Sequence, residues 1–161
     1  RQIPAPVSNS RILPMLGQWT DIVLHRANCT NVVVVALDEA TGAFLKPRGV
    51  PHYIKRLKAK DGQDSSQTDN HKTSALKFVI LAELLSAGVS VLLSDVDVVF
   101  FQDPFRALFA DSDVENMSDG WDDASVNGYT HELPTADGDV LRSVRHETRN
   151  SGLFYLSATN E

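Results

Sequence analysis

Two carboxylates lie inside an otherwise apolar run, VSVLLSDVDVVFFQDPF, which covers residues 89–105. Residues 89–93 have the length and the β-branched composition of a buried strand, and Asp95 and Asp97 follow at its carboxyl end. Because residues two apart face the same side of an extended backbone, both carboxylates are expected to point at one object. Two buried anions need protons, a cationic partner or a metal. We favour Mg²⁺ or Mn²⁺ with substrate phosphates completing its shell, so the run predicts a metal-bound diphosphate.

A second apolar run, VVVVAL at residues 32–37, is typical of a central parallel strand. It ends at Asp38, whose carboxylate lies where open α/β sheets bind their ligands, although helix N-capping explains Asp38 equally well. A short helix over residues 39–48 and a short strand over residues 50–54 complete a β-α-β order. The sequence therefore predicts an α/β protein with a mostly parallel sheet flanked by helices.

The other elements follow from apolar spacing and from chain breakers. Two helices are predicted from apolar residues that recur on one face, over residues 16–27 and 71–87. Two strands are predicted from short apolar runs, over residues 114–117 and directly after residues 150–152. Three segments are predicted to contain neither helix nor strand. Residues 1–15 are expected to form an extended lead-in, and residues 55–70 and 125–148 are expected to form loops. We expect one domain over residues 16–161.

Some residues outside the acidic pair carry chemistry as well as a plainer explanation. Lys77 lies within the apolar pattern of the 71–87 helix, where it is either solvated or in contact with a phosphate or the carboxylate pair. Turn formation explains Asp119, whereas the adjacent Asp122 and Asp123 are more unusual. Trp121 suits either a core position or a wall on which a sugar stacks.

Charge and cysteine content narrow the classes of partner. Residues 93–161 hold 4 Lys and Arg against 14 Asp and Glu, a net charge of −10, within a chain whose net charge is −6. This acidity argues against a nucleic-acid partner and is compatible with a cation-dependent site. A single cysteine, Cys29, excludes an internal disulfide framework. The five histidines show no paired spacing on a helix face, which disfavours zinc.

The location of the protein is indicated by two short patterns and by its apolar runs. Asn28-Cys29-Thr30 and Asn116-Met117-Ser118 both fit the N-glycosylation acceptor pattern, which points to the secretory pathway. No apolar run approaches the roughly 20 residues that a membrane-spanning helix needs. Because the chain begins without Met and stops directly after an apolar run, we expect it to be part of a longer protein that continues the domain beyond residue 161.

Three blocks occur in a characteristic order: HKTSALKFVILAELLSAGVSVLLSDVDVVFFQDPF, then MSDGWDD, then NSGLFYL. Together they resemble the nucleotide-diphospho-sugar transferases of plant and algal type, a family of arabinosyl-, xylosyl- and galactosyltransferase-like enzymes with the GT-A fold. The resemblance covers roughly residues 32–157. It implies a Rossmann-like GT-A domain, here incomplete, and a metal-dependent, retaining transfer from a nucleotide-diphosphate sugar, most simply a UDP-sugar. The implied acceptor is a glycan or glycoprotein, and the implied location is the Golgi lumen.

The resemblance also assigns roles to individual residues. Asp95 and Asp97 correspond to the DxD motif, which binds Mn²⁺ or Mg²⁺ on the donor diphosphate. Lys77 corresponds to a basic residue near the diphosphate or the donor sugar. Ala36 and Asp38 correspond to the nucleoside pocket. Asn150, Ser151 and Gly152 correspond to an element near the donor sugar. Asp122 and Asp123 correspond to residues that touch the sugar or the acceptor. Such enzymes commonly take another metal ligand, often His, from a later segment, so either this chain is incomplete or its metal site is.

Two other functions fit parts of the sequence. A strand followed by D-V-D-V-V also matches the motif of haloacid-dehalogenase-type phosphatases, with Asp95 as nucleophile. That motif normally opens its domain, whereas a β-α-β unit and a long helix precede it here. The second alternative is an inactive GT-A-like domain that serves as a binding or structural module.

Overall fold

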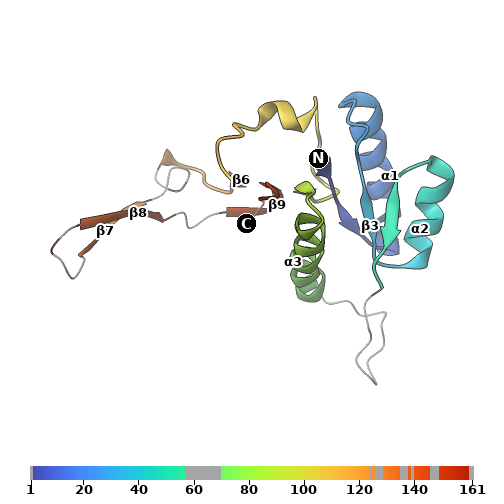
Figure 1. Ribbon diagram of the computed structural model, residues 1–161. Coiled ribbons are helices and arrows are strands. Elements are labelled where there is room, and N and C mark those ends of the chain that lie inside the picture. The colour runs from blue at the N-terminus through green and yellow to red at the C-terminus, as the bar shows by residue number, and fades with distance from the viewer. Residues whose placement is uncertain are drawn as a thin grey trace, which may run out of the picture.

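The computed structural model describes residues 2–56, 70–123, 125, 129–134, 138, 140–145 and 149–159 (Figure 1). Three α-helices are present among these residues: α1 (Leu13–Asp21), α2 (Glu39–Leu45) and α3 (Asn70–Ser86). The strands are β1 (Gln2–Pro4), β2 (Val7–Ser8), β3 (Val34–Ala36), β4 (His52–Ile54), β5 (Ser90–Ser94), β6 (Val114–Ser118), β7 (Tyr129–Pro134), β8 (Val140–Arg145) and β9 (Arg149–Leu156). The α/β class predicted from the sequence is confirmed.

The centre of the sheet is parallel. Strands β2, β3 and β4 pair in parallel, and β1 pairs in parallel with β5. Strand β9 then adds to β5 in the antiparallel direction, and β6 lies at the edge beside β9. The carboxyl ends of β3 and β5 therefore lie at the same edge of the sheet, which is where open α/β sheets bind ligands.

The prediction of a lead-in without secondary structure over residues 1–15 is wrong: β1 and β2 lie within the sheet between β3 and β5, Ser10–Ile12 form a 3-10 helix, and α1 begins at Leu13. The N–H of Ala5 donates to the carbonyl of Leu92 at 3.0 Å, on the β5 side. On the β3 side, the carbonyls of Pro4 and Pro6 accept from Val33 and Val35 at 3.1 and 2.9 Å. Both prolines are tolerated because their carbonyls accept ladder bonds although they have no N–H to donate.

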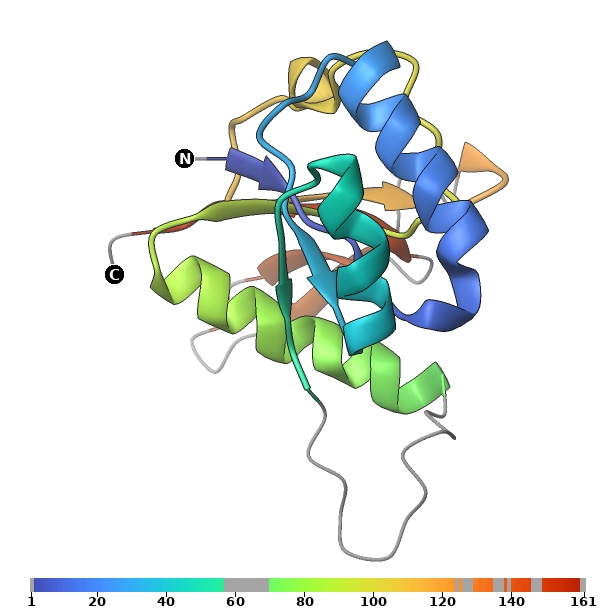
Figure 2. The ribbon, with the colours of Figure 1, turned by 90° about the vertical axis from the view of Figure 1, so that its right-hand side faces the viewer.

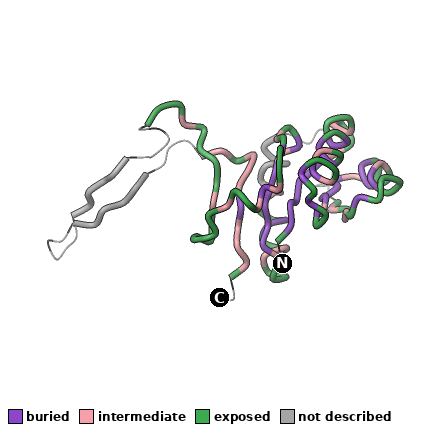
Figure 3. Tube along the Cα trace, turned by 90° about the horizontal axis from the view of Figure 1, so that it is seen from above, coloured by how far each residue is buried: buried purple, intermediate pink, exposed green. Residues whose placement is uncertain are grey.

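Helices cover both faces of the sheet (Figure 2). On one face, α3 packs through Ile80 and Leu81 against alternate strand residues such as Val35 and Val91. On the other face, α1 and α2 cover the core that contains Trp19. Buried positions accordingly concentrate along the central strands (Figure 3).

The first helix departs from regular α geometry at its end. It begins at Leu13, three residues before the predicted start, and passes at Ile22–Arg26 into a π-helical turn. The N–H of Ala27 donates to the carbonyl of Ile22 at 2.9 Å, which is the i→i+5 pattern. Asn28 then takes a left-handed conformation with φ of 53° and ends the segment.

The prediction of a loop over residues 125–148 is wrong in part, because β7 and β8 form an antiparallel hairpin within this range. Their sequences, YTHELP and VLRSVR, show neither a strict alternation of polar and apolar residues nor a continuous apolar run, so the apolar spacing does not predict strands there. The predicted loop over residues 55–70 lies mostly outside the described residues. No described helix combines the length and the apolar character required to cross a membrane.

Candidate functional site

The acidic pair follows directly on β5, at the ligand-binding edge of the sheet. Along β5, Val91 and Leu93 pack in the core beneath α3. Ser94 faces the opposite side and accepts a hydrogen bond from Trp19 Nε1 at 3.3 Å. Because strand side chains alternate, Asp95 is directed to the α3 side.

After Asp95 the backbone turns, so the prediction of an extended DxD segment is wrong. The N–H of Val98 donates to the carbonyl of Asp95 at 3.3 Å, which closes a turn over residues 95–98. Val96 and Phe100 both pack in the core beside α1, and the turn returns the chain to that core. Asp97 is exposed at the turn. The two carboxylates therefore share a tight turn instead of one face of a strand.

Lys77 on α3 forms an ion pair with Asp95, through Nζ and Oδ1. Lys77 lies one helical turn before Ile80 and Leu81, whose burial directs this face of α3 toward the sheet. Its side chain is only 14% exposed, and that of Asp95 is 38% exposed. Of the two explanations that the sequence left open for Lys77, the structure therefore shows contact with the carboxylate pair.

Residues 150–152 lie beside this ion pair, at the start of β9. The N–H of Asp95 donates to the carbonyl of Gly152 at 2.6 Å. A Cβ built on Gly152 would lie 3.1 Å from Asp95 Oδ2 and 3.0 Å from Asn150 Oδ1, so the absence of a side chain permits this approach. Ser151 is exposed.

The residues at the end of β3 are engaged within the protein. Asp38 caps α2, since Oδ1 accepts from the Thr41 N–H at 2.8 Å, and Oδ2 accepts from the Ser10 N–H at 2.8 Å. Burial acts to raise the pKa of Asp38, but the hydrogen bonds from Ser10 and Thr41 outweigh it and hold the pKa below its usual value. Ala36 is fully buried, and its carbonyl accepts from the Lys55 N–H at 2.8 Å.

The loop after β6 carries the second pair of acidic residues. Asp122 and Asp123 are both exposed there, as is Trp121, whose side chain is not a core aromatic. Asp122 Oδ1 accepts from the N–H of Ser125 at 2.8 Å and from its hydroxyl at 2.6 Å, so this carboxylate also closes a local turn. The sequence assigned Asp119 only to a turn, but its Oδ1 accepts a hydrogen bond from Asn150 Nδ2 at 2.6 Å.

Two carboxylates on one turn fit the divalent ions that the sequence predicts. Mg²⁺ commonly takes one or two protein carboxylates and completes its shell with water and substrate phosphates. Among the described residues, no group of three or more His, Cys, Asp or Glu could hold a metal ion alone. Asp95 and Asp97 could therefore hold an ion that depends on its substrate for further ligands.

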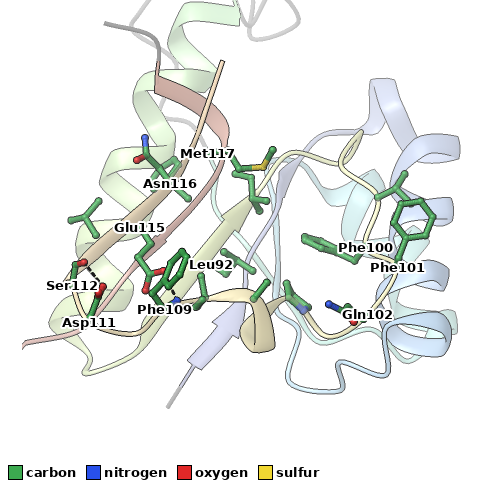
Figure 4. A pocket seen from close by; sticks show the side chains of 17 residues that line it. Leu92, Phe100, Phe101, Gln102, Phe109, Asp111, Ser112, Glu115, Asn116 and Met117 are labelled. Atoms are coloured by element: carbon green, nitrogen blue, oxygen red, sulfur yellow. Dashed lines mark hydrogen bonds between the residues drawn. The ribbon is translucent and has the colours of Figure 1, made fainter. Parts of the chain in front are cut away.

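A separate cavity of about 630 Å³ lies beyond the turn, between β6 and the segment after Asp97 (Figure 4). Its floor includes the buried Leu92 and Phe100, and its rim includes Phe101 and Phe109, which are 74% and 87% exposed. Neither the acidic pair nor Lys77 lines it. Its lining is mostly apolar, and its charged residues, Asp111 and Glu115, are acidic and would repel a diphosphate, so the turn and not this cavity is the candidate donor site.

Comparison with known proteins decides the family. The model of the nucleotide-diphospho-sugar transferase family matches residues 27–161, which include the turn, Lys77 and residues 150–152. The chain belongs to this family. Membership sets aside the phosphatase alternative, in which Asp95 would be a nucleophile.

Curated proteins with sequences similar to this chain come from Arabidopsis thaliana. Arabinosyltransferase RRA2 is 37% identical over 99% of this chain and 38% of its own length, and arabinosyltransferase RRA1 is 36% identical over 99% and 40%. UDP-D-xylose:L-fucose alpha-1,3-D-xylosyltransferase MGP4 is 29% identical over 76% of this chain and 34% of its own length. The chain thus spans about two-fifths or less of these relatives.

A solved structure shares the fold of this chain. The CMP:2-keto-3-deoxy-manno-octonic acid synthetase in complex with CTP aligns with a TM-score of 0.56, covering 98% of this chain and 74% of that one. The sequences are 11% identical, so the likeness supports the Rossmann-like α/β architecture alone. It agrees with the fold class predicted from the sequence.

Proposed function

We propose that the chain forms the donor-binding part of a metal-dependent glycosyltransferase, which moves a sugar from a UDP-sugar to a glycan or glycoprotein acceptor. The observation that carries the proposal is the meeting of Lys77, Asp95 and Gly152 at the ligand-binding edge of the sheet. The ammonium group of Lys77 suits a diphosphate directly, and the carboxylates suit it through a divalent ion. The backbone at Gly152, which carries no side chain, allows close approach. Family membership supports the same conclusion.

Each residue of the site receives a role in this proposal. Asp95 and Asp97 hold Mn²⁺ or Mg²⁺, which when bound neutralises the charge that develops on the leaving diphosphate. Lys77 fixes the orientation of Asp95 through their ion pair and supplies positive charge beside the diphosphate. Ser151 and Gly152 lie at the start of β9 beside the donor sugar, and the missing side chain of Gly152 leaves room for Asp95 and Asn150 to approach that strand.

The remaining assignments concern the nucleoside, the sugar and the acceptor. Ala36 and Asp38 mark the end of β3 beside the nucleoside, with Asp38 shaping that end through its cap on α2. Asn150 can offer the donor sugar one amide hydrogen, because its other groups are engaged within the protein. Asp122 and Asp123 contact the sugar or the acceptor from the loop after β6.

The donor and the location are inferred from the relatives. The relatives are named as arabinosyl- and xylosyltransferases, so a pentose is the first sugar to test, with retention of anomeric configuration. We assign the protein to the Golgi lumen. Exposed acceptor asparagines at Asn28 and Asn116 support a secretory location.

A donor-turnover assay tests the proposal. The chain is incubated with Mn²⁺ and, in turn, with UDP-arabinose, UDP-xylose and UDP-galactose, and the UDP released with and without a fucosyl or arabinosyl acceptor is measured. We expect release with a pentose donor, and loss of release in Asp97→Ala but not in the control Gln18→Glu, an exposed site on α1. Absence of release with every donor, together with no binding of UDP, would support the inactive-module alternative.

A further inference from the structure

Among the described residues, a side-chain pair links the loop after β6 to β9. Asp119 follows the last residue of β6, and its Oδ1 accepts a hydrogen bond of 2.6 Å from Asn150 Nδ2 on β9. The two residues are 31 positions apart in the sequence. This bond therefore fixes the start of a loop that continues through Trp121 to the acidic residues Asp122 and Asp123.

The orientation of the Asn150 amide is determined by its own strand. Oδ1 accepts from the N–H of Gly152 at 2.7 Å and from the N–H of Leu153 at 3.2 Å. Because two N–H donors require an acceptor, the oxygen must face them and Nδ2 must face Asp119. The amide is thereby preorganised to hold Asp119 before any ligand is present.

The same short segment also contacts the acidic turn. The carbonyl of Gly152 accepts from the N–H of Asp95 at 2.6 Å. A Cβ at Gly152 would lie within 3.1 Å of both Asp95 Oδ2 and Asn150 Oδ1. Asn150 therefore stands between the acidic turn on one side and the loop of Asp119 on the other.

We propose that Asp119 and Asn150 act as a clamp, which positions the loop of residues 119–123 beside the Asp95 turn. Both are positioning residues, and the groups that they position are Trp121, Asp122 and Asp123. The ligand facing these groups, the donor sugar or the acceptor, rests on the proposed function. The clamp itself depends only on the hydrogen bond between a carboxylate and an amide.

A reciprocal exchange tests the clamp. Asn150→Asp sets two carboxylates against each other and breaks the bond, whereas Asp119→Asn keeps it because an amide oxygen replaces the carboxylate. The double variant carrying both changes restores the bond with its direction reversed. Asp119→Ala, at an exposed site, removes the bond without adding charge. Gln18→Glu adds the charge of Asn150→Asp elsewhere and serves as the matched control.

The first measurement does not depend on activity. The order parameters of the Gly120 and Trp121 backbone N–H groups are measured by ¹⁵N relaxation in each protein. We expect about 0.85 in the parent, Asp119→Asn, Gln18→Glu and the double variant, and less than about 0.6 in Asn150→Asp and Asp119→Ala. Order parameters that stay near those of the parent in both Asn150→Asp and Asp119→Ala would overturn the clamp. So would order parameters in the double variant as low as those in Asn150→Asp.

The second measurement separates the clamp from the proposed function. Transfer turnover is expected to fall by about 10- to 100-fold in Asp119→Ala and to be kept in Asp119→Asn, because misplacing contact groups by about 1 Å costs this much. Mn²⁺-dependent UDP affinity should change less than threefold in Asp119→Ala. If the parent chain binds no UDP, the proposed function is refuted. The clamp is then tested by the order parameters alone. Equal turnover in Asp119→Ala and the parent would contradict the positioning role.

Discussion

Gly152→Ala is the substitution that probes the site most locally. Its Cβ would meet Asp95 Oδ2 at 3.1 Å and Asn150 Oδ1 at 3.0 Å, both closer than ordinary van der Waals contact. Gly152 is not among the residues with positive φ, so alanine fits the backbone and should gain the roughly 0.5–1 kcal/mol that glycine loses in a strand. Overpacking costs about 1–3 kcal/mol, which outweighs that gain. We therefore expect a net loss of up to about 2 kcal/mol in the free energy of unfolding.

The larger effect of Gly152→Ala should be on the site. To relieve the contact, the Asp95 carboxylate must move by a few tenths of an ångström. This approaches about 0.5 Å, the largest displacement that the groups of a binding site tolerate without loss of function. We expect the Mn²⁺-dependent Kd for UDP to rise about tenfold, or about 1.4 kcal/mol.

Isothermal titration calorimetry of Gly152→Ala, with thermal unfolding measured in parallel, gives both quantities. Gln18→Ala, at an exposed position on α1 outside the candidate site, is the control and should keep the Kd of the parent. An unchanged Kd in Gly152→Ala would refute the reasoning, because the contact with Asp95 would then be immaterial to nucleotide binding.

Three further predictions concern the Lys77–Asp95 ion pair, the Asp38 cap and the two glycosylation acceptor patterns. Lys77→Met keeps the apolar part of the side chain but removes the ammonium group from Asp95, so UDP affinity should fall about tenfold. Tm should fall by less than about 4 °C, since an ion pair whose carboxylate is more than one-third exposed to solvent is worth about 1 kcal/mol or less. A large fall in Tm with affinity kept would make Lys77 structural. The lowered pKa of Asp38 means that its stabilising effect is present above the usual carboxyl pKa and is lost as the pH falls through the lowered one. Asp38→Asn should therefore be less stable than the parent at pH 7, and the difference in Tm should shrink as the pH falls through the lowered pKa of Asp38; parallel pH–Tm curves would contradict this. Expression through a secretory pathway should add glycans at Asn28 and Asn116, which mass spectrometry before and after glycosidase treatment detects; an unmodified mass would argue against a secretory location.

Much of the sheet could be predicted because its strands have clear local signals. The run at residues 32–37 is apolar without interruption, as a strand with both faces covered requires, and it contains β3. The N-terminal strands lacked such a signal, since Pro4 and Pro6 normally argue against a central strand. Their place in the sheet depends on partners almost 30 residues or more away, such as Val33 and Leu92, which no local pattern reveals.

The site was predictable in its residue types but not in its geometry. The sequence indicated Asp95, Asp97 and Lys77, and it left the contact between Lys77 and the acidic pair as one of two possibilities. It predicted an extended backbone where a turn occurs, because alternating Asp and Val have the pattern of a strand while the cause of the turn is core packing. Asp119 was assigned to an ordinary turn, since its partner Asn150 lies 31 residues away.

The central claim is that Asp95 and Asp97 bind a nucleotide diphosphate through a divalent ion. Calorimetric titration of the chain with UDP, with and without Mn²⁺, tests it directly when the parent is compared with Asp97→Ala. We expect binding only with Mn²⁺ in the parent, and none under either condition in a folded Asp97→Ala, because the exposed carboxylate supplies part of the ion's shell. UDP binding that is equally strong without Mn²⁺, or that survives unchanged in Asp97→Ala, would contradict the account.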